Sequence, residues 1–253
     1  MADSIAMLPA HNKYGLPLAF SSDGETLYTG GFDGTVTAWS VAEEIQLASR
    51  SVHDQSVNCG ELSRERLLTG STDCTIRRST TSLDNTGRIL EGHSNTVADV
   101  AAHQDDPLLA SASYDSTVRI WNLDDDSEPI VLEGHPKNVT CVEFLADGGC
   151  VASGGLGEDL FVWDTAAGEV ETKLGGHGDA VAGLTVENAE RFWTVSYDGQ
   201  VFGWSTTDWS EMVSIDLSID GKATGLAAHP QVDQLAITVN GGVRILSMDG
   251  ETV

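Results

Sequence analysis

The sequence predicts an all-β protein, a six-bladed β-propeller, on three observations. A tryptophan, or a residue in its place, recurs about every 42 residues from one end to the other, and such long-period repetition marks a repeat architecture. Short apolar runs alternate with Asp-Gly and related turns, which supply the positive-φ positions of tight hairpins. Helical periodicity is almost missing. Four strands in each repeat make one propeller blade, and radial packing of blades shelters the sheet edges.

The tryptophan positions define six repeats. They fall at Trp39, Ser79, Trp121, Trp163, Trp204 and Leu246. We expect a single domain over residues 1–253, with repeats at approximately 11–52, 53–91, 92–133, 134–175, 176–217 and 218–253. A chain of 253 residues suits a single domain when the fold is all-β.

The outer strands decide how the propeller closes. Sequence patterns predict them at 44–49, 88–91, 129–133, 169–174 and 211–217, which leaves the last repeat without one. Residues 4–9 (SIAMLP) precede the first repeat at the place of an outer strand. We therefore expect residues 1–10 to supply the N-terminal strand that closes the last blade. A missing seventh blade is the alternative.

The third repeat shows the motif most fully. Gly92-His93 is followed by an apolar strand, and residues 115–121 then read DSTVRIW. These residues resemble the WD-repeat (WD40) β-propeller family, and the match recurs in register along the chain. The resemblance implies a non-enzymatic scaffold that binds a protein or peptide partner on one face, an expectation by fold analogy. A propeller-fold enzyme and the repeat region of a larger regulatory assembly are the alternatives.

The resemblance also implies a buried hydrogen-bond relay in each regular blade, where the imidazole meets the turn Asp and a strand Ser or Thr meets the indole. The matching sets are His11, Thr29, Asp33, Trp39; His93, Ser111, Asp115, Trp121; and His177, Thr194, Asp198, Trp204. Ser113 and Ser196, two residues later, are alternative hydroxyl groups. In the fourth repeat Gly157 replaces the Asp, with Glu158 or Asp159 as candidate substitutes. Sets repeated in separate blades cannot converge on one substrate, so we expect no catalytic residues.

The net charge of −26, from 39 acidic and 13 basic residues, makes nucleic acid and anionic membranes improbable ligands. Abundant Asp and Glu with scarce Lys resembles proteins of salt-loving organisms; an ordinary acidic cytosolic protein is the alternative. No signal peptide or membrane span is evident, and the four cysteines form no metal-binding or redox motif. We expect a cytoplasmic monomer with free thiols, no cofactor and no metal.

The residue before the turn Asp is the candidate for partner binding, because in the family it points toward one face. In this chain five such positions, together with Tyr14, are expected to form the partner-binding face: Tyr14, Phe32, Thr72, Tyr114, Leu156 and Tyr197. Exposed aromatic side chains are the usual material of binding hot spots. The alternative is that some of these rings pack between blades.

Overall fold

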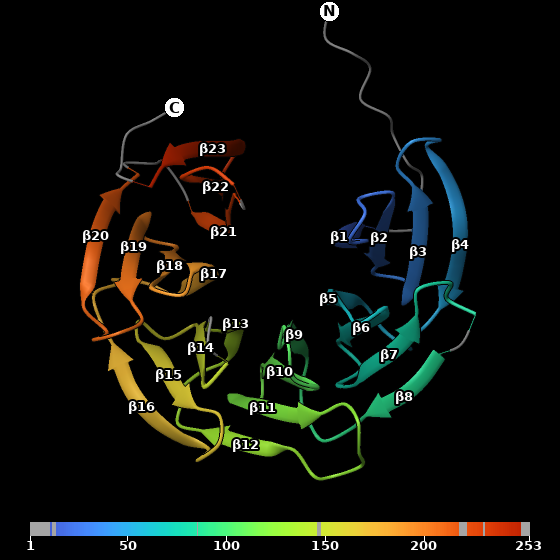
Figure 1. Cartoon of the computed structure of the whole chain (residues 1–253), viewed down its shortest axis with the longest axis horizontal. Coiled ribbons are helices and arrows are strands. Elements are labelled where there is room, and N and C mark those ends of the chain that lie inside the picture. Colours follow the sequence, from blue (N-terminus) through green and yellow to red (C-terminus); the bar gives the residue numbers. More distant parts are fainter. Residues whose placement is uncertain are drawn as a thin grey trace, which may run out of the picture. The chain divides into compact units, whose positions relative to one another are not determined.

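The computed structural model describes residues 11, 14–84, 86–145, 148–217, 222–229 and 231–248. This part of the chain holds 23 strands and no helix, and the strands form six antiparallel sheets, the blades (Figure 1). The all-β, six-bladed fold class is confirmed. The predicted closing strand at residues 4–9 lies outside the described residues.

The chain divides into two compact units, residues 1–100 and 101–253. The first unit holds two four-stranded blades, with orders β1-β2-β3-β4 and β5-β6-β7-β8. The strands are β1 (Gly15–Phe20), β2 (Thr26–Gly31), β3 (Thr35–Ser40), β4 (Ile45–Ser51), β5 (Val57–Ser63), β6 (Arg66–Ser71), β7 (Ile76–Thr80) and β8 (Thr86–Leu90). The boundary between the units falls within β9 (Val97–Ala102).

The second unit continues the pattern. Its strands are β10 (Leu108–Ser113), β11 (Thr117–Asn122), β12 (Ile130–Glu133), β13 (Val139–Phe144), β14 (Cys150–Gly155), β15 (Leu160–Asp164), β16 (Glu169–Leu174), β17 (Val181–Asn188), β18 (Arg191–Ser196), β19 (Gln200–Ser205), β20 (Glu211–Asp216), β21 (Ala223–Ala228), β22 (Gln234–Val239) and β23 (Gly242–Ser247). The last blade has three strands among the described residues. The five outer strands expected from the sequence correspond to β4, β8, β12, β16 and β20.

The turn between the second and third strands of a blade needs a left-handed residue. In the first blade this residue is Gly34, with φ of 79°, and a Cβ there would collide with the backbone carbonyl of His53. Gly199 has the same role in the fifth blade, with φ of 82°. Cys74 and Ser116 hold the position in the second and third blades, each with φ of 70°, so two blades accept the strain of a non-glycine residue.

Two tryptophans of third strands pack in a cluster with a small residue of the preceding blade. Trp163 shares a buried cluster with Ala110 of the blade before it. Trp204 likewise shares a cluster with Ala152. A small residue in the middle of one second strand thus leaves room for the indole of the next blade.

Where the tryptophan is missing, the size pattern is reversed. Leu246 replaces the indole in the sixth blade, and Trp193 of the fifth blade shares its buried cluster. Trp193 takes the register position that Ala110 and Ala152 take in their blades. In the first unit Tyr28 takes the same position ahead of Ser79, and its hydroxyl donates to the Thr81 carbonyl at 3.1 Å. An aromatic ring from the preceding blade therefore accompanies each replaced tryptophan.

No helix in the described part of the chain is long and apolar enough to cross a membrane.

Candidate functional site

The first blade brings together all four residues of its predicted relay. His11 Nε2 lies 2.9 Å from Thr29 Oγ1, and the Trp39 indole donates to the same oxygen at 3.0 Å. On the other side of the ring, Nδ1 lies 2.8 Å from Thr35 Oγ1 and 3.6 Å from Asp33 Oδ1. The Thr35 hydroxyl donates to Asp33 at 2.6 Å, so it links imidazole and carboxylate.

The second blade has the direct contact between imidazole and carboxylate but no indole. His53 Nδ1 lies 2.9 Å from Asp73 Oδ2, and Nε2 lies 2.9 Å from Thr69 Oγ1. Burial lowers the pKa of His53, and the Asp73 carboxylate opposes this shift. Ser79, in the tryptophan position, is buried, and its Oγ has no hydrogen-bond partner among the described residues.

In the third blade the Trp121 indole donates to Ser111 Oγ at 2.8 Å. The alternative hydroxyl of Ser113 accepts instead from the backbone N–H of Asp115 at 3.1 Å, so it supports the turn. His93 is buried in the same blade.

The fifth blade repeats the arrangement, but its carboxylate lies farther from the imidazole than in the second blade. His177 Nε2 and the Trp204 indole nitrogen each lie 2.9 Å from Thr194 Oγ1. His177 Nδ1 lies 4.0 Å from Asp198 Oδ1 and is buried without a hydrogen-bond partner in the described part of the molecule. Burial lowers the pKa of His177 to about 4, although the Asp198 charge acts in the opposite direction. Ser196 Oγ accepts from the Asp198 backbone N–H at 3.3 Å, as Ser113 does in the third blade.

The fourth blade keeps the hydroxyl half of the relay. His135 Nε2 lies 2.7 Å from Ser153 Oγ, and the Trp163 indole donates to that oxygen at 2.8 Å.

The carboxylate half is absent from this blade. Gly157 stands at the Asp position, and within the described residues neither Glu158 nor Asp159 pairs with His135. Burial lowers the pKa of His135 to about 4, and the Lys173 charge adds to the shift. The fourth imidazole is thus held neutral without an acidic partner.

These relays are poorly suited to catalysis. In the fifth blade Thr194 is fully buried, and its hydroxyl lies between an imidazole and an indole. A nucleophile must reach its substrate, and this oxygen has no open approach. The geometry therefore favours a structural role.

Two of the residues predicted to bind a partner touch each other in the first unit. Tyr14 is 79% exposed and Phe32 41% exposed, and their rings meet edge to face at 5.8 Å between centroids. The Phe32 backbone N–H donates to the Tyr14 carbonyl at 2.9 Å. Thr72, the third predicted residue here, exchanges hydrogen bonds with Asn58 and offers no apolar surface of comparable size.

The other three predicted residues follow the second strands of consecutive blades in the second unit. Tyr114 follows β10 and Leu156 follows β14, and each is 40% exposed. Tyr197 follows β18 and is half-buried, and the Lys222 ammonium lies 3.9 Å from its ring centroid. A cation above an aromatic face is a favourable contact, so Tyr197 is already partly engaged.

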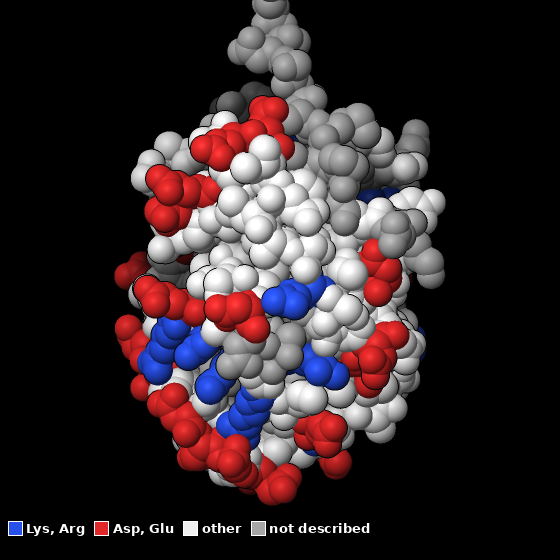
Figure 2. All heavy atoms as spheres, turned by 90° about the vertical axis from the view of Figure 1, so that its right-hand side faces the viewer, with Lys and Arg blue, Asp and Glu red and all other residues white. Residues whose placement is uncertain are grey.

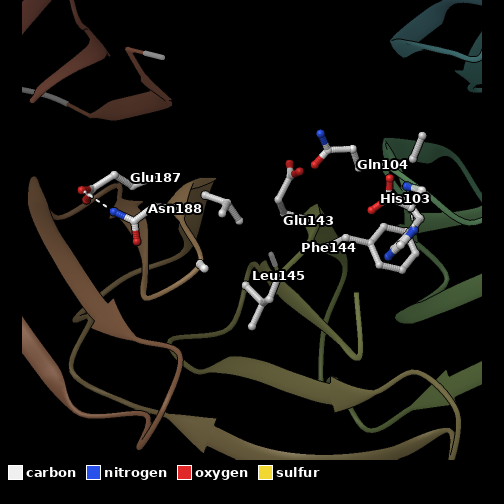
Figure 3. Close-up of a pocket in the computed structure, with 11 residues that line it drawn as sticks. His103, Gln104, Glu143, Phe144, Leu145, Glu187 and Asn188 are labelled. Carbon is white, nitrogen blue, oxygen red and sulfur yellow. Dashed lines mark hydrogen bonds between the residues drawn. The ribbon is translucent and has the colours of Figure 1, made fainter. Parts of the chain in front are cut away.

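A cavity of about 380 Å³ in the second unit has no counterpart in the sequence analysis. It lies where β9, β13 and β17 end, and Figure 3 shows Glu143 between Gln104 and the Glu187–Asn188 pair. Glu187 accepts from the Trp193 indole at 2.7 Å and from the Asn188 amide at 2.9 Å. Three separate repeats contribute to the lining, so no single motif could have revealed the cavity.

No group of three or more His, Cys, Asp or Glu residues in the described part of the chain is arranged to hold a metal ion.

Comparisons with known proteins point to one family. The model of the WD40 family (WD domain, G-beta repeat) matches residues 4–40, 84–122 and 127–164. Mitochondrial division protein 1 of Schizosaccharomyces pombe is 29% identical in an alignment 129 residues long, which covers 43% of this chain and 20% of that protein. The probable coatomer subunit beta' of the same yeast is 32% identical in an alignment 110 residues long, which covers 41% of this chain and 14% of that protein. The chain therefore spans a fifth or less of these relatives.

Proposed function

Because this chain is a WD-repeat protein, we propose that it acts as a non-enzymatic scaffold that binds a protein or peptide partner. The observation that carries the proposal is the exposure of Tyr114 and Leu156 at one topological position in successive blades. Large apolar side chains that directly follow rigid strands cost little entropy when a partner covers them.

A test compares two double variants in pull-downs from a lysate of the source cells at native salt, read by mass spectrometry. Tyr114→Ala with Tyr197→Ala should abolish capture of the partners that the wild-type chain retains. Ile130→Ala with Met212→Ala is the matched control, because these apolar residues are similarly exposed but lie on the outer strands β12 and β20. If the two variants retain equal amounts of the partners, the face that carries Tyr114 and Tyr197 is not the binding surface.

A second proposal is that the scaffold works as one region of a larger assembly. Its support is the small share of each matched relative that this chain covers, 20% and 14%. Size-exclusion chromatography of a native extract, probed with an antibody to the chain, should place it in a high-mass fraction. Elution at the monomer position would contradict this second proposal.

We also propose a reducing, cytoplasmic location. Its support is that none of the four cysteines, Cys59, Cys74, Cys141 and Cys150, forms a disulfide with another described residue. Fractionation of source cells with detection of the chain tests it, and recovery from an oxidising compartment would refute it.

A further inference from the structure

The fourth blade contains a buried histidine with one ring nitrogen that lacks a partner. His135 is 7% exposed, and its Nε2 lies 2.7 Å from Ser153 Oγ. Nδ1, on the other side of the ring, has no hydrogen-bond partner among the described residues. His177 Nδ1 is fully buried in the fifth blade, whereas His135 Nδ1 remains accessible to solvent. A nearly buried polar atom that is still accessible is suited to contact with a ligand.

The hydrogen-bond pattern around Ser153 places the ring proton on Nδ1. The Trp163 indole donates to Ser153 Oγ at 2.8 Å, so this hydroxyl group already accepts one bond. Its own proton is satisfied when the hydroxyl donates to His135 Nε2, and a neutral imidazole then carries its proton on Nδ1. Burial lowers the pKa of His135 to about 4, so the ring is neutral at pH 7. Nδ1–H is therefore a donor without an acceptor in the described part of the chain.

In other blades a carboxylate lies on this side of the ring. In the first, second and fifth blades the corresponding Nδ1 lies 3.6, 2.9 and 4.0 Å from the turn Asp. Gly157 replaces that Asp in the fourth blade, and a Cβ there would meet only Pro136 Cγ, at an ordinary 3.8 Å. Pro136 has no backbone N–H, whereas Asp54 N–H in the second blade donates to Asp73 at 3.1 Å. The replacement therefore leaves space beside the turn and one donor to satisfy, Nδ1–H.

A positive charge lies beside the same ring. Lys173 Nζ is 4.5 Å from the centre of the Phe161 ring, and the His135 ring packs against this phenyl group with 4.1 Å between centroids. Lys173 forms an ion pair with no described residue, and its charge contributes to the lowered pKa of His135. An anion bound to Nδ1–H would therefore gain both a hydrogen bond and a nearby ammonium group.

The charge of the whole chain limits which anions can bind. The net charge is −26, and Figure 2 shows Asp and Glu side chains spread over one side of the molecule, with Lys and Arg gathered in part of it. Glu158 and Asp159 are exposed next to Gly157, so water and salt screen their repulsion, with a Debye length of about 8 Å at 0.15 M ionic strength. A hydrogen bond from a buried N–H is screened much less. A single carboxylate is therefore favoured over a long polyanion.

We propose that the fourth blade binds a carboxylate group of a ligand at the place where the first, second and fifth blades hold their own Asp. One carboxylate oxygen accepts from His135 Nδ1–H, and the Lys173 ammonium stabilises the negative charge. A carboxylate is the acceptor that the motif accommodates elsewhere, whereas phosphate needs more donors than this site offers. The carboxylate belongs either to a small free acid or to an Asp side chain of a bound peptide. This inference does not depend on the proposed function.

The test follows the imidazole resonances of the full chain by NMR at about pH 6, where His135 and His177 are both neutral. Sodium formate, the smallest carboxylate salt, replaces sodium chloride at constant ionic strength. The His135 resonances should shift and saturate as formate is added. The His177 resonances should move little, because Nδ1 of that ring is fully buried.

Gly157→Asp supplies the carboxylate from the chain itself. It should weaken formate binding at least tenfold and raise the pKa of His135 above about 4, since a nearby negative charge favours the imidazolium form. Ala166→Asp is the matched control, because it adds the same charge at an exposed position of the same blade, and it should change the affinity less than twofold. Lys173→Gln should weaken formate binding several-fold, whereas Lys222→Gln, which removes an exposed lysine of the sixth repeat, should change it less than twofold.

Two capped tripeptides distinguish the sources of the carboxylate. Acetyl-Gly-Asp-Gly-amide has one carboxylate, on its side chain, and acetyl-Gly-Asn-Gly-amide has none. If formate and the Asp tripeptide both shift the His135 resonances, a peptide side chain reaches the site. If only formate shifts them, the site binds small free carboxylates.

Three results would overturn the proposal. An unchanged His135 spectrum when formate replaces chloride would show that no carboxylate binds. A formate response that persists in Gly157→Asp would place the anion elsewhere. Equal shifts with the Asp and Asn tripeptides would show that the carboxylate is not what is recognised. The variant Tyr114→Ala with Tyr197→Ala should bind formate normally, because those tyrosines lie outside the fourth blade, so failure of this inference and of the proposed function can be told apart.

Discussion

The exchange of large and small residues between adjacent blades leads to a quantitative prediction at Trp193. This side chain is fully buried in a cluster with Leu246, and its indole donates to Glu187 at 2.7 Å. Trp193→Ala should lower the free energy of unfolding by about 3–5 kcal/mol, the usual cost of truncating a buried tryptophan. Loss of the hydrogen bond to Glu187 is part of that cost.

The informative experiment adds Leu246→Trp, which restores the arrangement of a small residue facing an indole, as Ala152 and Trp204 have it. Leu246→Trp alone should overpack the cluster and cost about 1–3 kcal/mol. In the double variant the new indole enters the space left by Trp193. The two effects should therefore not add, and the double variant should recover about 2–3 kcal/mol relative to their sum.

Urea denaturation followed by circular dichroism measures all four proteins of this cycle. Trp193→Ala combined with Val118→Ala is the control pair, because Val118 belongs to a different buried cluster and its effect should add. If Trp193→Ala and Leu246→Trp also add to within about 0.5 kcal/mol, the two sites do not compensate and the reasoning is refuted.

Two further predictions concern the relays. Ser153→Ala should lower the free energy of unfolding by about 1–3 kcal/mol, since it leaves His135 and Trp163 without their shared oxygen. Ser79→Ala should be neutral or stabilising, because the Ser79 hydroxyl is buried without a hydrogen-bond partner among the described residues. Equal destabilisation of the two variants in urea denaturation would contradict this prediction. His135 and His177 have pKa values of about 4 in the folded chain and near 6.5 in the unfolded chain, so the unfolded chain takes up protons first as the pH falls. The free energy of unfolding should therefore decrease as the pH is lowered from about 6.5 toward 4. At pH 5 the loss should be about 2 kcal/mol per histidine. His135→Gln should flatten this dependence, and an unchanged slope between pH 7.5 and 5 would refute the assignment; the lowered pKa of Asp198 acts only at a lower pH.

Features carried within one repeat could be predicted from the sequence. The turn Asp, the strand hydroxyl and the tryptophan each occupy a fixed place in the motif, so their positions follow from the period. The five outer strands follow from turn residues and short apolar runs. The choice between Ser111 and Ser113 needed the structure, because both lie on the same side of one strand.

Features that depend on two repeats escaped the sequence analysis. Ser79 and Leu246 are visible as departures from the motif, but their compensation by Tyr28 and Trp193 lies one repeat earlier, at a position where Ala110 and Ala152 stand in other repeats. A signal did exist, namely an aromatic residue in the middle of a second strand. This signal could be interpreted only once it was known which residues of adjacent blades pack together. The cavity beside Glu143 depends on three repeats and left no such signal.

The second blade departs from the motif at its tryptophan position but keeps the arginine that accompanies the tryptophan in the third blade. In the third blade the Arg119 guanidinium lies 6.0 Å from the centre of the Trp121 ring, two residues along the strand. Arg77 holds the equivalent position before Ser79, so the second blade has the cation without the indole. Framework residues that recur in every blade cannot distinguish one partner from another. A blade that replaces its framework tryptophan but keeps the arginine two residues before it differs locally from the regular blades, and selective recognition depends on such differences.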